Sequence, residues 1–100
     1  MKKPVQSEKE NYVKQRLLQL EDWRTHVDML KVKADRSIAS TRLQYNRQID
    51  ELLSKYLQAQ TKLNGLQNAS ERAWGDCKLR VDRAWQELIN EYDKARSKFK

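Results

Sequence analysis

The chain has 100 residues, of which 38% are apolar and 35% are charged, and its net charge is +7. This length excludes more than one modest domain, and the low apolar content disfavours a large globular core. One proline, two glycines and the lack of turn-residue clusters between alternating strands favour an all-α fold. No stretch is long and apolar enough for a signal peptide or a membrane span, and a single cysteine provides no disulfide framework. We therefore expect a cytoplasmic protein.

The basic excess raises nucleic acid and anionic membranes as partners. Residues 1–50 carry 11 basic and 7 acidic side chains, and residues 51–100 carry 10 and 7, so the excess is spread evenly along the chain. Because basic and acidic residues are interleaved, and no basic stripe is present that would follow phosphates, nucleic-acid binding is not expected. Local basic concentrations occur only near the termini, at Lys2, Lys3, Lys94, Arg96, Lys98 and Lys100.

Residues 1–6 contain the only proline and no apolar pattern, and we predict a flexible lead there. Ser7 is predicted to begin the helical region, residues 7–99. Its hydroxyl can accept from the amide of Glu10, while the Glu10 side chain can reach back to the Ser7 amide, which is the pattern of a capping box.

Apolar residues then follow one another in steps of three and four, the spacing of one face of a helix. Between Val27 and Tyr56 these steps group into elevens, so that Val27 recurs as Ile38 and Ile49, with Thr41 as a polar interruption. The spacing tightens to heptads between Leu52 and Cys77. This pattern predicts a coiled coil that is left-handed in its middle and nearly straight on either side. The stripe consists of Val13, Leu17, Leu20, Trp23, Val27, Leu30, Ala34, Ile38, Tyr45, Ile49, Leu52, Tyr56, Ala59, Leu63 and Leu66.

An eleven-residue unit is repeated in the last third of the chain, where Arg72-Ala73-Trp74 returns as Arg83-Ala84-Trp85. Eleven residues make three helical turns, so the repeat keeps one face nearly straight. Trp74 and Trp85 lie one residue to the side of that face, and we interpret them as widening the stripe so that more than two helices can pack. The face consists of Ala73, Cys77, Val81, Ala84, Leu88, Tyr92, Ala95 and Phe99.

The one credible interruption is Asn64-Gly65, after which Asn68 and Glu71 could cap a new helix. The stripe nevertheless passes this point in phase, and a glycine inside a helix costs only about 1 kcal/mol. We therefore predict one long, mostly continuous coiled-coil helix. The alternative is a two-helix antiparallel hairpin with its turn near Asn64-Gly65.

A lone helix leaves its apolar stripe in water, so we expect self-association into a dimer or small bundle, with the helices antiparallel. The predicted helix–helix interface consists of Leu17, Leu20, Trp23, Val27, Leu30, Ala34, Ile38, Tyr45, Ile49, Leu52, Tyr56, Leu63, Leu66, Ala73, Trp74, Cys77, Val81, Ala84, Trp85, Leu88, Tyr92 and Phe99.

No arrangement of residues indicates catalysis, a metal or a cofactor, and we do not expect an enzyme. His26 has Asp22 and Asp28 nearby, but a zinc site needs three or four protein ligands. Cys77 lies on the apolar stripe with no histidine near it in sequence to activate the thiol, so we expect a small packed side chain. Across a symmetric antiparallel dimer it could also meet its mate.

A second hypothesis for the function is an amphipathic helix that binds anionic membrane surfaces. Indole and basic side chains at helical spacing, such as Trp85 and Ile89 with Arg83 and Lys94, suit the lipid interface. Acidic residues at positions 87, 91 and 93 lie among them and weaken this hypothesis.

Several short motifs together carry a resemblance to known proteins. They are Lys33-Ala34-Asp35, Tyr45 with Gln48, Ile49 and Leu52, Ala73-Trp74, Ala84-Trp85 with Leu88, and the run Lys94 to Phe99. These motifs resemble those of a family of small bacterial coiled-coil proteins, often uncharacterised and sometimes described as stress-response proteins. The resemblance implies a cytoplasmic, non-enzymatic helical protein linked to stress, and it supplies no catalytic residue. Gly75 and Cys77 depart from the ordinary helix formers expected of that family.

Overall fold

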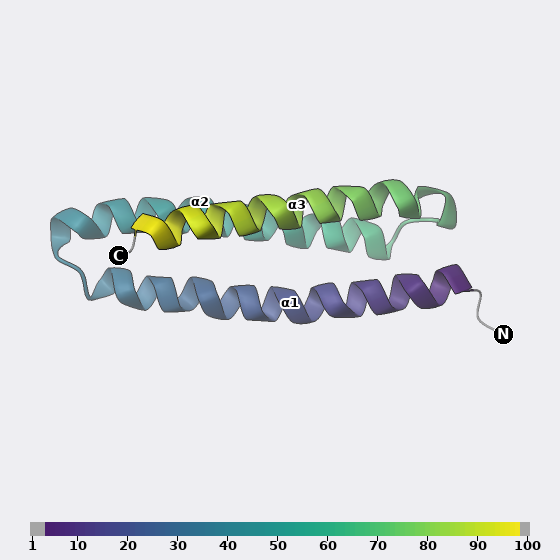
Figure 1. The fold of residues 1–100 in the computed structure, drawn as a ribbon, viewed down its shortest axis with the longest axis horizontal. Coiled ribbons are helices and arrows are strands. Elements are labelled where there is room, and N and C mark those ends of the chain that lie inside the picture. Colours follow the sequence, from purple (N-terminus) through teal and green to yellow (C-terminus); the bar gives the residue numbers. More distant parts are fainter. Residues whose placement is uncertain (1–3, 99–100) are drawn as a thin grey trace.

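The computed structural model describes the backbone of residues 4–98 and the side chains of residues 8–98. Three α-helices follow one another, α1 (Pro4–Asp35), α2 (Ala39–Gln67) and α3 (Glu71–Lys98), and no strand occurs within these residues. Figure 1 shows α2 running antiparallel to its two neighbours, in a bundle of 58 × 19 × 18 Å. The prediction of an all-α fold is confirmed.

The single long helix and the two-helix hairpin were both wrong, because the chain reverses twice. Gly65 lies inside α2, and the second reversal follows Gln67 rather than Asn64. The apolar period continues through both turns in the sequence, although Ile38, which lies on it, is exposed in the first turn. The period marks the core side of each helix and does not show whether the chain reverses between helices.

The turn between α2 and α3 is closed by local hydrogen bonds. The amide of Ala69 donates to the carbonyl of Leu66, and the side chain of Asn68 donates to the carbonyl of Asn64, which satisfies carbonyls at the end of α2. Ser70 then caps α3, because its hydroxyl oxygen accepts from the amide of Ala73 at 3.3 Å. The cap that the sequence assigned to Asn68 therefore comes from Ser70.

The turn between α1 and α2, at residues 36–38, contains neither glycine nor proline and was not predicted. Ile38 precedes α2 in an extended conformation, with φ −66° and ψ 155°, and its side chain makes no capping hydrogen bond. Arg42 reaches back across the turn, donating to the carbonyl of Ser37 at 3.0 Å and to that of Asp35 at 3.3 Å. One arginine therefore satisfies the last carbonyl of α1 and one carbonyl of the turn.

The first helix begins at Pro4, earlier than predicted. Proline suits the first position of a helix because its missing amide hydrogen has no partner there in any case. Residues 4–6 are therefore helical rather than part of a flexible lead, and Ser7 lies inside α1 instead of at its start. The rest of the predicted lead, residues 1–3, and Phe99 lie outside the described residues.

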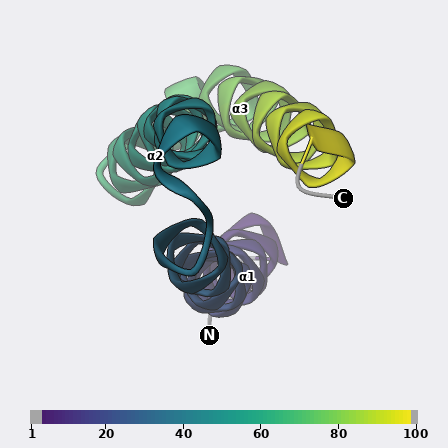
Figure 2. The ribbon, with the colours of Figure 1, turned by 90° about the vertical axis from the view of Figure 1, so that its left-hand side faces the viewer.

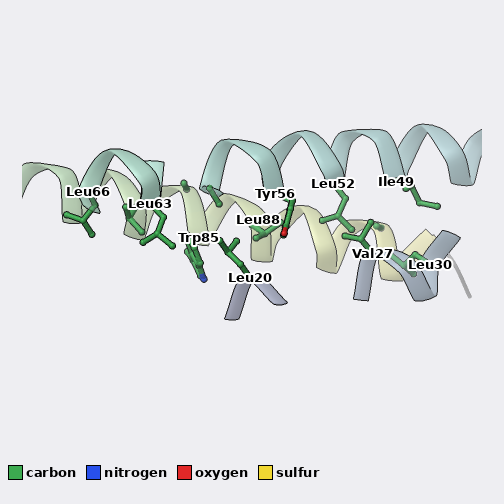
Figure 3. Close-up of a cluster of buried hydrophobic side chains, with 14 of the residues drawn as sticks. Leu20, Val27, Leu30, Ile49, Leu52, Tyr56, Leu63, Leu66, Trp85 and Leu88 are labelled. Carbon is green, nitrogen blue, oxygen red and sulfur yellow. The ribbon is translucent and has the colours of Figure 1, made fainter. Parts of the chain in front are cut away.

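The core runs along the axis of the bundle, between the inward faces of the three helices (Figure 3). In the end-on view of Figure 2, α2 lies close to both other helices, whereas α1 and α3 approach each other less closely. This spacing leaves room for large side chains between α1 and α3. The buried apolar residues are Leu20, Val27, Leu30, Ala34, Ile49, Leu52, Tyr56, Ala59, Leu63, Leu66, Val81, Ala84, Trp85, Leu88 and Ala95.

The two glycines, Gly65 and Gly75, lie inside helices, and neither has a positive φ. A Cβ atom built on either glycine meets no heavy atom within 4 Å. We expect Gly65→Ala and Gly75→Ala each to raise the free energy of unfolding by about 0.5–1 kcal/mol, because alanine has less backbone freedom to lose. Urea unfolding followed by circular dichroism measures this, and a loss of stability would show that the glycine is needed for its conformation.

Candidate functional site

The space between α1 and α3 is filled by aromatic and charged side chains, which we call the aromatic seam. They come from two separate clusters, one at each half of the helices, and both join α1 to α3. The seam consists of Tyr12, Arg16, Trp23 and His26 from α1, and of Trp74, Lys78, Asp82, Trp85 and Tyr92 from α3.

Arg16 organises the first cluster. The central carbon of its guanidinium group lies 4.8 Å from the ring centre of Trp85 and 5.1 Å from that of Tyr12. Its Nη2 atom lies 2.9 Å from Oδ1 of Asp82, and the Tyr12 hydroxyl donates a hydrogen bond to the same oxygen. Burial, together with this bond to a carboxylate, raises the pKa of Tyr12 to about 12. A cation, an anion and two rings thus join α1 to α3.

The second cluster contains Trp23, His26 and Tyr92. The ring centres of Trp23 and Tyr92 lie 5.1 Å apart in an edge-to-face arrangement, and His26 stacks on Tyr92 at 5.3 Å. His26 therefore has an aromatic environment rather than a set of ligands. Within the described residues, no three His, Cys, Asp or Glu side chains are grouped so as to hold a metal ion.

Two buried indole N–H groups in the seam donate no hydrogen bond to any residue that the structure describes. The Nε1 atoms of Trp74 and Trp85 are buried, and neither has a partner among the described residues. A buried donor without a partner costs about 1–3 kcal/mol. These two groups therefore lower the net stability of the contact between α1 and α3.

The residues predicted to form an interface between chains lie mostly in contacts within one chain. Leu17 and Ile38 are instead exposed, at 42% and 72% of their surface. The half-buried residues are Trp23, Tyr45, Ala73, Trp74, Cys77 and Tyr92. The buried residues are Leu20, Val27, Leu30, Ala34, Ile49, Leu52, Tyr56, Leu63, Leu66, Val81, Ala84, Trp85 and Leu88.

Sequence reasoning did not find Tyr12, Arg16 and Asp82. Tyr12 and Arg16 are four residues apart in α1, a spacing that places them on the same face of the helix and could have indicated the cluster. Asp82 comes from another helix, α3. It also missed Gln48, which is buried with the rest of the core. The Oε1 atom of Gln48 has no hydrogen-bond partner among the described residues.

Two ion pairs among the described residues join α2 to α3. Lys55 lies 3.6 Å from Glu87, and Lys94 lies 3.8 Å from Glu51. Burial, together with a hydrogen bond to the carboxyl group of Glu51, raises the pKa of the Glu91 carboxyl group above its usual value.

Comparison with protein families, with curated proteins and with solved structures finds no match to this chain. No helix among the described residues is both long enough and apolar enough to cross a membrane.

Proposed function

We propose that the chain is a non-enzymatic interaction protein that self-associates by exchanging α1 between two copies. In the exchanged dimer, residues 36–38 become helical and α1 and α2 join into one helix from Pro4 to Gln67. At about 1.5 Å per residue this helix is roughly 96 Å long. Each α1 then packs on α2 and α3 of the other copy, and the two long helices run antiparallel.

The observation that carries the proposal is the position of Ile38. It stands eleven residues after Val27 and eleven before Ile49, and both of these are buried, yet Ile38 is 72% exposed. In a continuous helix Ile38 falls on the same face as the other two. An antiparallel pairing centred on the turn places the two copies of Ile38 beside each other, out of water.

The start of α2 supports the same proposal. Ile38 offers no capping oxygen, and the first turn of α2 contains no acidic residue to favour the positive end of the helix dipole. In a continuous helix, the amides of Ala39 and Ser40 donate to the carbonyls four residues before them. Straightening the turn therefore replaces an uncapped helix end by regular hydrogen bonds.

The aromatic seam explains how α1 can leave. The indole donors of Trp74 and Trp85 have no partner among the described residues, so separating α1 from α3 releases groups that hydrogen-bond water once exposed. Conditions that loosen the bundle, such as heat, favour exchange. This is the link we propose to the stress response that the family resemblance implies.

The substitution Ala39→Pro tests the exchange. Ala39 is exposed and is the first residue of α2, where proline is favoured, and Ile38 already has the conformation preferred before a proline. Inside a continuous helix, the same proline costs about 3 kcal/mol in each chain. We expect the wild-type chain to form an elongated dimer at high concentration and Ala39→Pro to remain monomeric. Light scattering coupled to gel filtration measures the mass, and X-ray scattering measures the radius of gyration.

The variant Ser37→Ala changes the equilibrium in the opposite direction. Ser37 lies in the turn of the closed bundle and becomes helical only in the exchanged dimer, where alanine is favoured by about 0.5 kcal/mol, so we expect a larger dimer fraction. A dimer that forms equally well with Ala39→Pro would show that association uses another surface. A wild-type chain and a Ser37→Ala variant that both stay monomeric at high concentration would contradict self-association.

A further inference from the structure

The fold gathers basic residues at the end of the bundle that holds the α1–α2 turn. Figure 1 shows the end of α3 returning to this turn, and Lys98 lines one hollow together with Tyr45 and Arg47 near the start of α2. Among residues 31–47 and 95–98, Asp35 is the one acidic residue. The basic residues there are Lys31, Lys33, Arg36, Arg42, Arg47, Arg96 and Lys98.

The neighbouring turns of the bundle carry the opposite charge. Residues 20–30, 48–53 and 86–93 contain a single basic residue, Arg24, among many acidic ones. The charge is therefore distributed unevenly along the axis of the bundle, although it is spread evenly along the chain. A negatively charged surface attracts the turn end and repels the adjacent turns, so it orients the molecule end-on. The acidic residues are Glu21, Asp22, Asp28, Asp50, Glu51, Glu87, Glu91 and Asp93.

Large apolar side chains are exposed at the same end. Ile38 is 72% exposed in the turn, Leu43 is 74% exposed in the second turn of α2, and Val32 is 50% exposed near the end of α1. Lys33 and Arg36 lie between them in the chain and form no ion pair within the part of the chain that the structure describes. Exposed aliphatic side chains among unpaired basic ones match the two properties of an anionic lipid surface, its acyl boundary and its negative charge.

We propose that the turn end of the bundle docks onto anionic lipid surfaces, with Ile38 and Leu43 entering the headgroup region. The basic side chains around them bind the lipid phosphates. Nucleic acid fits this end less well, because Ile38 and Leu43 have no role against phosphates and the adjacent acidic turns repel a duplex that lies along the rod. The site differs from the helix face around Trp85 that the sequence suggested, since that indole is buried in the closed bundle.

Docking at this end requires neither unfolding nor exchange of α1. The side chains that carry it are exposed while α1, α2 and α3 remain packed. The variant Ala39→Pro, which holds the turn in its closed form and keeps Ile38 exposed, is therefore expected to bind lipid at least as tightly as the wild-type chain does. If the self-association proposal fails, the lipid binding expected of the closed bundle still stands. If the lipid proposal fails, the expected self-association still stands.

Co-sedimentation with vesicles tests the proposal on the full chain and on Ala39→Pro. We expect binding to vesicles of phosphatidylcholine with phosphatidylglycerol, at least tenfold stronger than binding to phosphatidylcholine alone, and weakening as salt is added. The variant Lys33→Gln, Arg36→Gln is expected to bind about tenfold or more weakly. Ile38→Ser, Leu43→Ser is expected to bind at least fivefold more weakly.

The matched controls lie at the opposite end of the bundle. Lys62→Gln, Arg72→Gln removes two exposed basic residues there, and Leu79→Ser removes an apolar side chain that is 65% exposed. Both controls are expected to bind as the wild-type chain does, and helix content by circular dichroism verifies that each variant is folded. Equal losses in the controls, or no binding to anionic vesicles, would overturn the proposal. So would binding to a DNA duplex that is tighter than binding to vesicles and insensitive to Ile38→Ser, Leu43→Ser.

Discussion

Replacing Leu52 by alanine is expected to lower the free energy of unfolding by about 2–5 kcal/mol. Leu52 lies in the middle of α2, the helix that contacts both others, and its side chain is fully buried in the core (Figure 3). Truncation removes apolar area from the core and leaves a cavity that the rigid helices cannot fully close. Because a domain of this size has a total stability of only about 5–15 kcal/mol, the loss is a large part of the whole.

Leu57→Ala is the matched control for this substitution. Leu57 is on the same helix, but 51% of its surface is exposed, and the same truncation there is expected to change stability by about 0.5 kcal/mol or less. Urea unfolding of both variants measures the difference. Similar losses at the two positions would contradict the assignment of the inward face of α2, because the two leucines lie on opposite sides of that helix.

The inward face of each helix could be predicted from the sequence because burial repeats with the helical period. Val27, Leu52, Leu63 and Leu88, all assigned to the stripe from steps of three and four, are fully buried. This signal is local and survives any change in how the helices are arranged. It therefore identified the core side of each helix without identifying the number of helices.

The turns could not be predicted, because tertiary packing overrides weak local preferences there. Residues 36–38 carry no helix breaker, and Ile38 continues the apolar period into a position where it is exposed. Gly65, the strongest local signal for a break, lies within a helix that buries Leu63 and Leu66 on either side of it. Burying both leucines outweighs the roughly 1 kcal/mol that glycine costs.

The aromatic seam and the charged end depend on residues that are distant in the chain. Tyr12 and Asp82 are separated by 70 positions, and only the two reversals bring them together. Trp74 and Trp85, interpreted from the sequence as widening the stripe, contact Tyr12 and Arg16 of α1. These contacts could not be predicted from the sequence, because they depend on which helix lies beside α3 and in which direction it runs.

Replacing Trp85 by alanine is expected to have the largest effect of any single substitution in the seam, a loss of about 3–5 kcal/mol in the free energy of unfolding. The side chain is 3% exposed, and Arg16 of α1 stacks on its ring. Without the ring, Arg16 keeps its contact with Asp82 but loses an attraction to an aromatic face. The substitution therefore weakens mainly the packing of α1 against α3.

Hydrogen exchange of backbone amides distinguishes this local effect from a general one. In Trp85→Ala, the amides of α1 are expected to exchange faster by a larger factor than those of α2, because α1 separates before the α2–α3 pair unfolds. Trp85→Phe is the control, since it keeps a ring for Arg16 and removes the indole N–H that has no partner among the described residues. It is expected to cost less than about 1.5 kcal/mol. Equal acceleration in all three helices would show that the bundle opens as one unit, and exchange of α1 between copies would then require complete unfolding.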